Sequence, residues 1–365
     1  MSLKLTKSIS LCTTCMNRLP HVKETLIRNI LDNKSCKNVE FVLLDYNSTD
    51  GLEDYVKNNL YNYISDGSLS YYRTDTPSAY NMSHPRNLAF RLAKGEILCN
   101  VDADNFTGKD FASHVLELFS SQEDIFLSTH KASWVKNDVL GRIAVRNSDF
   151  MALGGYDEQM KFYGFDDYDL INRLQIYGLK KVLIEEDRFL KAIAHSNADR
   201  MENWINHSNL SEMLISYISP AKSKLVFLWK DQRYTVGTMV SNENIRLLEN
   251  SPRSFSKYSF DVEEQYWSEG QWKYEKKQIH FNGTHRFVFD RSKTSDSWFL
   301  KGSGQVFYNI KNPRLIEEAI FFYHQTSNRA VMEDNLKAGR FRVNEPGFGM
   351  GLVTGNFKGK YRFDH

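Results

Sequence analysis

Two aspartates, Asp102 and Asp104, stand one residue apart at the end of an apolar run that begins at Leu98. Mg²⁺ and Mn²⁺ prefer oxygen ligands in proteins and keep coordination positions for the phosphates of a substrate. Two carboxylates at this spacing, on a turn after a strand, can serve one metal ion and one sugar hydroxyl or water. Solvated aspartates in a loop would give the same pattern, so the pair needs support from elsewhere in the chain.

A second acidic group lies in residues 154–174, GGYDEQMKFYGFDDYDLINRL. Asp166 and Asp167 open a predicted helix there, where the helix dipole favours negative charge. Capping alone would account for one of these aspartates. Three aspartates within four residues, after a loop rich in glycine and aromatic residues, are more than capping requires. A carboxylate of this group is therefore a candidate general base.

One histidine is a candidate partner for the first acidic pair. His195, in KAIAHSNADR, follows an apolar stretch and precedes a polar one, which places it at the boundary of an element. A single histidine in such a place is more often structural. It becomes a candidate metal ligand because the Asp102–Asp104 site lacks a further protein ligand and because imidazole is the commonest one.

The elements that would position these groups alternate between strands and helices over residues 1–218. Apolar runs predict strands at 8–16, 39–47, 69–75 and 96–104, and helical spacing predicts helices at 19–33, from 52, and at 83–95. This alternation predicts βαβ units and a mainly parallel central sheet of the Rossmann-like α/β class. Ligands of such sheets bind at the carboxyl ends of the strands. The polar residues at those ends are Thr13, Asn17, Asp45, Asn47, Asp102 and Asp104.

Residues 219–365 follow a different pattern. Short alternating runs between residues 223 and 310 predict antiparallel β structure. A helix is predicted near 313–338, with Asn312 as its N-cap and Gly339 closing it. The glycine-rich tail predicts a loop and a strand. We expect a smaller β-rich α+β domain here, whose tryptophans either pack in its core or bind an acceptor glycan.

The composition is that of a globular protein of 365 residues, long enough for two domains. A formal net charge of +2 offers no field that would recruit nucleic acid, so we expect no nucleic-acid partner. No apolar run approaches the ~18 residues of a membrane helix, and no signal-peptide pattern opens the chain. These features predict a cytoplasmic location, with at most peripheral contact at the inner face of the membrane.

The cysteines, Cys12, Cys15, Cys36 and Cys99, all lie in the first hundred residues. Cys12 and Cys15 form a CxxC, which would suit a redox pair or half a zinc site. No second CxxC follows, and the pair lies at the end of a predicted strand. We expect buried free thiols.

In this order, the motifs resemble those of family 2 inverting glycosyltransferases with the GT-A fold. LCTTCMNR, LLDYNSTDG and HPRNLAFRLAKGEILCNVDADN resemble the family's first-strand, nucleotide-binding and D-x-D blocks, although the proline of the first block is missing. GGYDE and FYGFDDYDLINRL are similar to the acceptor loop and Glu-Asp motif of β-1,4-galactosyltransferases, with Asp166 in place of the glutamate. The resemblance covers about residues 7–215 and implies a GT-A catalytic domain at 1–218.

The resemblance implies a role for each matching residue. For the nucleotide these are Thr13, Arg18, Asp45 against the uracil, Arg86 near the uracil or diphosphate, and Asp102 at the ribose or sugar. Asp104 would bind Mn²⁺ or Mg²⁺ together with His195. Asp167 would occupy the catalytic position, with Asp166 beside it. The implied partners are a UDP-sugar donor and a glycan or lipid-linked saccharide acceptor.

These roles predict metal-dependent, inverting hexosyl transfer. The acceptor hydroxyl would lose its proton to Asp167 while its oxygen attacks the anomeric carbon and UDP leaves from the opposite face. The resemblance implies galactose or a related hexose, and a role in bacterial surface polysaccharide synthesis. Two other classes stay open: a non-catalytic glycan-binding protein on a transferase scaffold, and a sugar nucleotidyltransferase. The lack of glycine in CTTCMNRLPH counts against the latter.

Overall fold

The computed structural model describes residues 7–76, 80–129, 139–194, 209–219, 222–240, 267–283 and 286–364. The chain divides into two compact units. The first comprises Met1–Trp204 and Val331–His365, and the second comprises Ile205–Ala330. The two units therefore differ from the expected ranges 1–218 and 219–365, because the end of the chain returns to the first unit.

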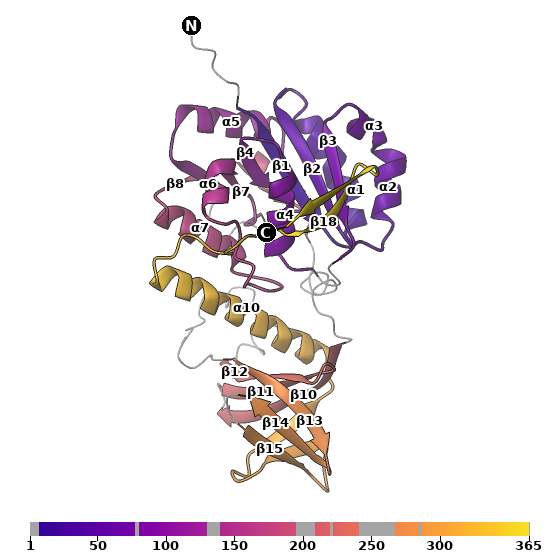
Figure 1. The fold of residues 1–365 in the computed structure, drawn as a ribbon, viewed down its shortest axis with the longest axis vertical. Helices are drawn as coiled ribbons and strands as arrows, with labels where there is room; N and C mark the ends of the chain where they lie inside the picture. The colour runs from indigo at the N-terminus through magenta and orange to yellow at the C-terminus, as the bar shows by residue number, and fades with distance from the viewer. Residues whose placement is uncertain are drawn as a thin grey trace. The chain divides into compact units, whose positions relative to one another are not determined.

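The first unit alternates strands and helices, as Figure 1 shows. The elements before the D-x-D turn are β1 (Ile9–Cys15), α1 (Leu19–Asp32), β2 (Val39–Tyr46), α2 (Leu52–Asn59), α3 (Tyr61–Ser65), β3 (Leu69–Thr74), α4 (Ser83–Leu92) and β4 (Ile97–Asn100). Those after it are β5 (Asn105–Phe106), α5 (Phe111–Ser121), β6 (Ile125–Thr129), β7 (Ile143–Arg146), α6 (Asn147–Ala152), α7 (Asp166–Ile176), β8 (Lys180–Ile184), the 3₁₀ turn η1 (Asp187–Phe189) and β9 (Lys191–Ala192). The predicted strands are confirmed as β1 to β4, and the predicted helices as α1, α2 and α4.

Nine strands form one sheet in the order β19-β18-β3-β2-β1-β4-β7-β6-β8. The four strands β3, β2, β1 and β4 pair in parallel, and β7 runs antiparallel between β4 and β6. In the parallel part, the carboxyl ends of the strands meet at one edge of the sheet. The register Cys15↔Asp45 between β1 and β2 brings the polar residues that follow these strands together.

The glycine-rich tail extends this sheet beyond β3. It forms a hairpin of β18 (Gly351–Gly355) and β19 (Gly359–Phe363), seen in yellow in Figure 1, where the expectation was a loop and one strand. Strand β18 pairs antiparallel with β3. Asn356 completes the junction, because its backbone N–H donates to the Tyr71 carbonyl at 2.7 Å and its Oδ1 accepts from the Tyr71 N–H at 2.9 Å.

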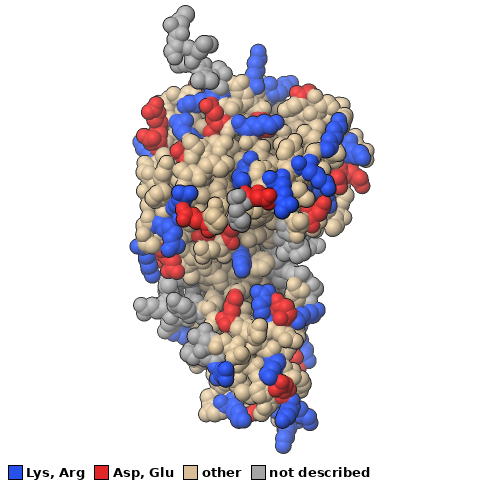
Figure 2. Space-filling view, viewed as in Figure 1, with Lys and Arg blue, Asp and Glu red and all other residues tan. Residues whose placement is uncertain are grey.

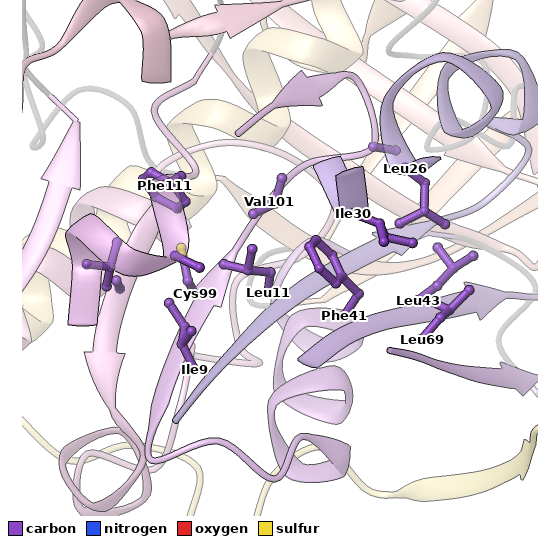
Figure 3. Packing of buried hydrophobic residues seen from close by; sticks show 14 of the residues in the cluster. Ile9, Leu11, Leu26, Ile30, Phe41, Leu43, Leu69, Cys99, Val101 and Phe111 are labelled. Carbon is purple, nitrogen blue, oxygen red and sulfur yellow. The ribbon is translucent and has the colours of Figure 1, made fainter. Parts of the chain in front are cut away.

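The core of the first unit lies between this sheet and the helices that cover it. Ile9 and Leu11 of β1 lie on the same side as Leu26 and Ile30 of α1, with Phe41 of β2 beside them (Figure 3). All are buried. Leu26 and Ile30 are four residues apart, which is the spacing that puts two side chains on one helix face. Each such buried side chain contributes about 1.5–3 kcal/mol.

The second unit is a closed antiparallel barrel. Its strands are β10 (Leu210–Ser219), β11 (Lys222–Trp229), β12 (Arg233–Val240), β13 (Ser268–Glu275), β14 (Gln278–Gly283), β15 (Arg286–Arg291), β16 (Ser297–Leu300) and β17 (Val306–Ile310). The predicted antiparallel β structure is confirmed. Buried apolar side chains fill the barrel, among them Leu228, Phe281 and Trp298. Ring centroids of Phe281 and Phe287 lie 4.2 Å apart. A barrel of this strand number is just wide enough to be filled in this way.

The predicted long helix is α10 (Pro313–Lys337). Asn312 caps it, since its Oδ1 accepts from the backbone N–H of Arg314 at 3.0 Å and of Leu315 at 3.3 Å. Gly339 follows the helix with a left-handed φ of +59°. Although α10 has 25 residues, no described helix is both long and apolar enough to cross a membrane. Positive and negative side chains intermingle over the face shown in Figure 2.

All four cysteines are free thiols, as expected. Cys12, Cys15 and Cys99 are buried in the sheet, whereas Cys36 is half-buried. Burial raises the pKa of the Cys99 thiol to about 12 and holds the pKa values of Cys12 and Cys15 well above their usual range. The CxxC therefore carries protonated thiols at neutral pH rather than a reactive thiolate.

We expect one fast-reacting thiol in the native protein. With a disulfide reagent at about pH 8, Cys36 should react first, and the three buried thiols should react only after denaturant is added. Counting released chromophore before and after unfolding, with Cys36→Ser as control, tests this. A fast native reaction mapped to Cys12 or Cys15 by mass spectrometry would contradict it.

Candidate active site

The predicted acidic residues meet around one arginine. Arg86 lies on α4, Asp102 follows β4, and Asp166 and Asp167 open α7. The Arg86 Nη2 donates to Asp102 Oδ1 at 3.0 Å, and its Nη1 donates to Asp167 Oδ1 at 2.8 Å and to Asp166 Oδ2. Carboxylates of two motifs that are far apart in the sequence, the D-x-D turn and the start of α7, thus share one guanidinium.

The members of this acidic cluster differ in depth. The exposed fractions of their side chains are 1% for Arg86, 5% for Asp166, 18% for Asp167 and 29% for Asp102. Burial lowers the pKa of Arg86, but the three carboxylates raise it more, so the net pKa is well above the usual value. Burial raises the pKa of Asp166, and Arg86 opposes this shift. Of the two aspartates that open α7, Asp167 is the one that a substrate can reach.

A tyrosine and a glycine complete the surroundings of this arginine. The Tyr156 ring centroid lies 5.4 Å from the Arg86 guanidinium carbon. Asn100 Nδ2 donates to Asp102 Oδ1 and to the Gly141 carbonyl, both at 2.9 Å. A Cβ on Gly141 would lie 2.5 Å from Asp102 Oδ2 and 2.7 Å from Arg86 Nη2. A side chain at position 141, which the sequence pattern did not single out, would force Asp102 and Arg86 to shift.

The other aspartate of the D-x-D pair lies at a second strand junction. Asp104 Oδ1 accepts from Asn105 Nδ2 at 2.8 Å, and the Asp104 carbonyl accepts from the Ile193 N–H at 2.8 Å. Strand β5 pairs with β9 through Asn105 and Ala192. This pairing places Ile193 beside Asp104. Ile193 is two positions before His195, which lies outside the described residues.

Buried polar side chains hold the turn that carries Asp102 and Asp104. Thr25 of α1 donates to the carbonyl of Ala103 at 2.7 Å. Arg142, fully buried, donates through Nη2 to Asn105 Oδ1 at 3.0 Å and through Nη1 to the carbonyl of Phe189 in η1. Arg142 therefore ties β5 to the segment that leads into β9. Its only sequence signal is a lone cation in an apolar stretch.

Few side chains in the described site could bind a divalent cation. Within the described ranges, no three His, Cys, Asp or Glu side chains are grouped so that they could hold a metal. Mg²⁺ is commonly held by one or two carboxylates together with substrate phosphates, so a site of few protein ligands is compatible with this class of ion. Asp104 is the described member of the predicted pair and is partly exposed.

Asp45, predicted to meet a uracil, is fully buried at the end of β2. Its Oδ1 accepts from the Ser48 N–H at 2.8 Å, and its Oδ2 accepts from Tyr71 Oη at 2.9 Å and Arg73 Nη1 at 2.7 Å. The contact with uracil stays a prediction. Arg73 is partly exposed beside this carboxylate, and the sequence analysis did not identify it.

The remaining predicted nucleotide residues lie along the same edge of the sheet. Thr13 is buried in β1, and its neighbour Thr14 shares a hydrogen bond of 2.7 Å with Tyr80 Oη. Arg18 occupies the N-cap position of α1. Arg86, for which the resemblance implies a nucleotide contact, has both Nη groups on carboxylates. The nucleotide roles of these three residues stay predictions.

Removing the shared cation should destabilise the protein in a pH-dependent way. We expect Arg86→Met to lower the free energy of unfolding by about 3–5 kcal/mol near neutral pH, because the change leaves buried carboxylates unpaired. Burial already raises the pKa of Asp166 in the folded state. A group with a raised folded pKa stabilises when protonated, and this stability is lost as the pH rises through that pKa. The deficit should therefore shrink as the pH falls.

Urea unfolding of Arg86→Met and wild type across the acid range measures this difference. Arg91→Met is the matched control on α4, because the oxygen acceptors of Arg91 are the backbone carbonyls of Phe348 and Gly349. Glu158 acts on the charge of Arg91 without a direct ion pair, so the deficit of this control should change with pH far less than that of Arg86→Met. A constant deficit for Arg86→Met would contradict the electrostatic account.

Crowding the acidic cluster should also destabilise it. Gly141→Ala is expected to cost about 1–3 kcal/mol, the usual range for overpacking a filled site. In the control Gly351→Ala, the nearest atom to the new Cβ lies 3.9 Å away, so the change should be within about 0.5 kcal/mol. Equal unfolding midpoints for the two variants would contradict the prediction, since they would show that Asp102 and Arg86 shift without cost.

Residues 10–171 match the family described as glycosyl transferase family 2. No curated protein matches the chain.

Several solved structures are similar in part. The mannosyltransferase PcManGT of Pyrobaculum calidifontis, solved with GDP-Man and Mn²⁺, has 20% identity and a TM-score of 0.44 over 52% of this chain and 58% of its own. S. aureus TarS 1-349 has 16% identity and a TM-score of 0.42 over 50% of this chain and 59% of its own. A Drosophila beta-1,4-galactosyltransferase 7 variant with manganese, UDP-Gal and xylobiose has 13% identity and a TM-score of 0.38 over 55% and 78%. This chain thus spans less than two thirds of the first two.

The family match includes β1 to β4, the D-x-D turn and the opening of α7, which are the elements that carry the acidic cluster. The match to glycosyl transferase family 2 thus covers the part of the first unit that carries the acidic cluster, and the fold of this unit, a mainly parallel central sheet covered by helices, is of the GT-A type.

Proposed function

We propose that the chain transfers a hexose from a UDP-sugar to a hydroxyl of a glycan acceptor, with inversion at the anomeric carbon. The observation that carries this proposal is the acidic cluster, in which Arg86 joins Asp102 to the first two residues of α7. A base must lie within reach of the acceptor, and the acceptor must lie beside the donor. One guanidinium brings the two motifs with those roles together.

Asp167 is the general base in this mechanism. It is the more accessible of the two aspartates on α7, and Arg86 orients its carboxylate. The acceptor oxygen forms a bond to the anomeric carbon while the bond from that carbon to UDP breaks, and the hydroxyl proton passes to Asp167. Asp102 faces the ribose or sugar. Asp166 is too deep to meet the acceptor and holds Arg86 in place.

A divalent cation, Mn²⁺ or Mg²⁺, belongs at Asp104 and His195, where it would supply Lewis-acid stabilisation of the departing diphosphate. The hydrogen bond from Ile193 to the Asp104 carbonyl supports this pairing, since it holds the chain two residues before His195 against the turn. Thr13, Arg18 and Asp45 form the nucleotide side of the site. Arg73 joins them through its ion pair with Asp45.

The donor is UDP-galactose or a related UDP-hexose, because the segments GGYDE and FYGFDDYDLINRL resemble those of β-1,4-galactosyltransferases. The acceptor is a glycan or a lipid-linked saccharide of a bacterial surface polysaccharide. The reaction takes place in the cytoplasm, with at most peripheral contact with the membrane. The barrel binds glycan on its outer surface. Its interior is filled with apolar side chains, whereas Tyr217, Tyr274 and Tyr308 are exposed and can stack on sugar rings.

A panel of UDP- and GDP-sugars, with Mn²⁺ or with EDTA, tests the proposal by release of free nucleotide and by product formation. Asp167→Asn should lower transfer by roughly 10²–10⁴-fold, the usual contribution of general-base catalysis. Asp54→Asn is the control, because Asp54 is an exposed carboxylate in the first turn of another helix, α2. It should leave the rate unchanged.

The outcomes separate the candidate functions. A rate of transfer equal to that of the wild type in Asp167→Asn would show that Asp167 is not the base. Turnover that requires a nucleoside triphosphate would identify a nucleotidyltransferase. Binding of glycans without consumption of any nucleotide sugar would identify a binding protein on a transferase scaffold.

A further inference from the structure

Residues 154–158 form a loop between α6 and α7 that we call the acceptor-side loop, because its sequence GGYDE resembles the family's acceptor loop. It carries Tyr156, whose ring packs on Arg86. Gly154 and Gly155 both adopt left-handed backbone conformations, with φ of +74° and +75°. A loop with such a backbone needs partners that hold its polar groups in place.

Two segments supply those partners. On α4, Asn87 donates through Nδ2 to the Tyr156 carbonyl at 2.8 Å and accepts through Oδ1 from the Tyr156 N–H at 2.7 Å, and the segment after α10 supplies the others. Asn344 makes three hydrogen bonds to the acceptor-side loop: its Nδ2 donates to the carbonyls of Gly154 at 2.7 Å and Tyr156 at 2.5 Å, and its Oδ1 accepts from the Glu158 N–H at 2.9 Å. The N–H of Gly349 donates to Glu158 Oε1 at 2.8 Å. One side chain near the C-terminus thus satisfies three backbone groups of the loop.

The two glycines of the loop are required by this contact. A Cβ on Gly154 would lie 2.1 Å from the carbonyl oxygen of Val343, and one on Gly155 would lie 2.4 Å from Asn87 Oδ1 and 2.8 Å from the Phe348 ring. The Val343 N–H also donates to the Leu153 carbonyl at 3.1 Å. The glycine pair therefore allows the C-terminal segment to approach the loop closely.

A second amide links the acceptor-side loop to α7. The buried Asn335 donates through Nδ2 to Asp157 Oδ2 and to Asp169 Oδ1, both at 2.9 Å, and its Oδ1 accepts from Arg340 Nη1 at 2.8 Å. Asp169 also pairs with Arg173 at 2.6 Å. Because α7 begins with the two aspartates of the acidic cluster, Asn335 connects the loop to the helix that carries the base.

We propose that residues 335–350 are a positioning element of the acceptor site, with Asn344 as its central residue. Asn344 fixes the backbone of the acceptor-side loop, and Asn335 fixes that loop against α7. Neither amide belongs to the acidic cluster, so both act through the loop and not on the reacting atoms. The kinetic consequence rests on the proposed transferase function, whereas the conformation of the loop does not.

A matched pair of variants tests this proposal. Asn344 and Asn356 both have left-handed φ values, +59° and +48°, which glycine adopts without strain. Each side chain bonds to backbone groups of another segment, but those of Asn356 lie on β3, at Tyr71. Asn344→Gly and Asn356→Gly therefore make the same chemical change, and only the first affects the acceptor-side loop.

Asn344→Gly should lower kcat/KM for the acceptor between about 10- and 100-fold, because a small displacement of a positioning group costs this much. UDP affinity by calorimetry and the KM for the donor should stay unchanged. In the protein without substrates, amide exchange at Glu158, whose N–H donates to Asn344 Oδ1, should be roughly tenfold faster. Asn356→Gly should leave the kinetic values and this exchange as in wild type.

Two results would overturn the proposal: unchanged exchange in residues 154–158 of Asn344→Gly, or equal kinetic losses in the two variants. A loss of UDP affinity in Asn344→Gly would also count against it, since that would indicate a general structural defect. If the wild type consumes no nucleotide sugar, the proposed function fails. The exchange measurement still decides whether residues 335–350 hold the loop.

Discussion

The structure of the site depends on one buried cation. Arg86 has almost no contact with solvent, so its charge must be balanced by neighbouring groups, and three carboxylates from two distant motifs balance it. This requirement explains why the D-x-D turn and the start of α7 lie side by side, why glycine occupies position 141, and why an aromatic ring packs on the guanidinium. The carboxylate proposed as base is oriented by the same interaction.

Local sequence patterns predicted the parts of the fold that local forces determine. Period-2 and period-3.6 spacing located β1 to β4 and helices α1, α2 and α4, and the asparagine cap located the start of α10. The acidic residues were recognisable because Asp166 and Asp167 exceed what capping requires. Their meeting point was not recognisable, because the resemblance assigned Arg86 to the nucleotide and no local pattern links it to the carboxylates that the fold brings to it.

The features that sequence reasoning missed all depend on contacts between distant segments. Arg142 bonds to carbonyl and amide oxygens on both sides of the β5–β9 pair, Asn344 bonds to a loop far earlier in the chain, and the hairpin β18–β19 finds its partner in β3. None of these residues has a periodic or compositional signal. The glycines of GGYDE were noticed as a motif, but their physical cause, the close approach of Asn87, Val343 and Phe348, comes from segments distant in the sequence.

The discontinuity of the first unit has a consequence for biosynthesis. A ribosome releases the strands β1 to β8 long before β18, since the whole barrel is translated in between. Until β18 emerges, β3 presents an unpaired edge, and unpaired edges of apolar strands are sites of association between chains. The sheet of the nascent first unit therefore stays incomplete until β18 has been translated and pairs with β3.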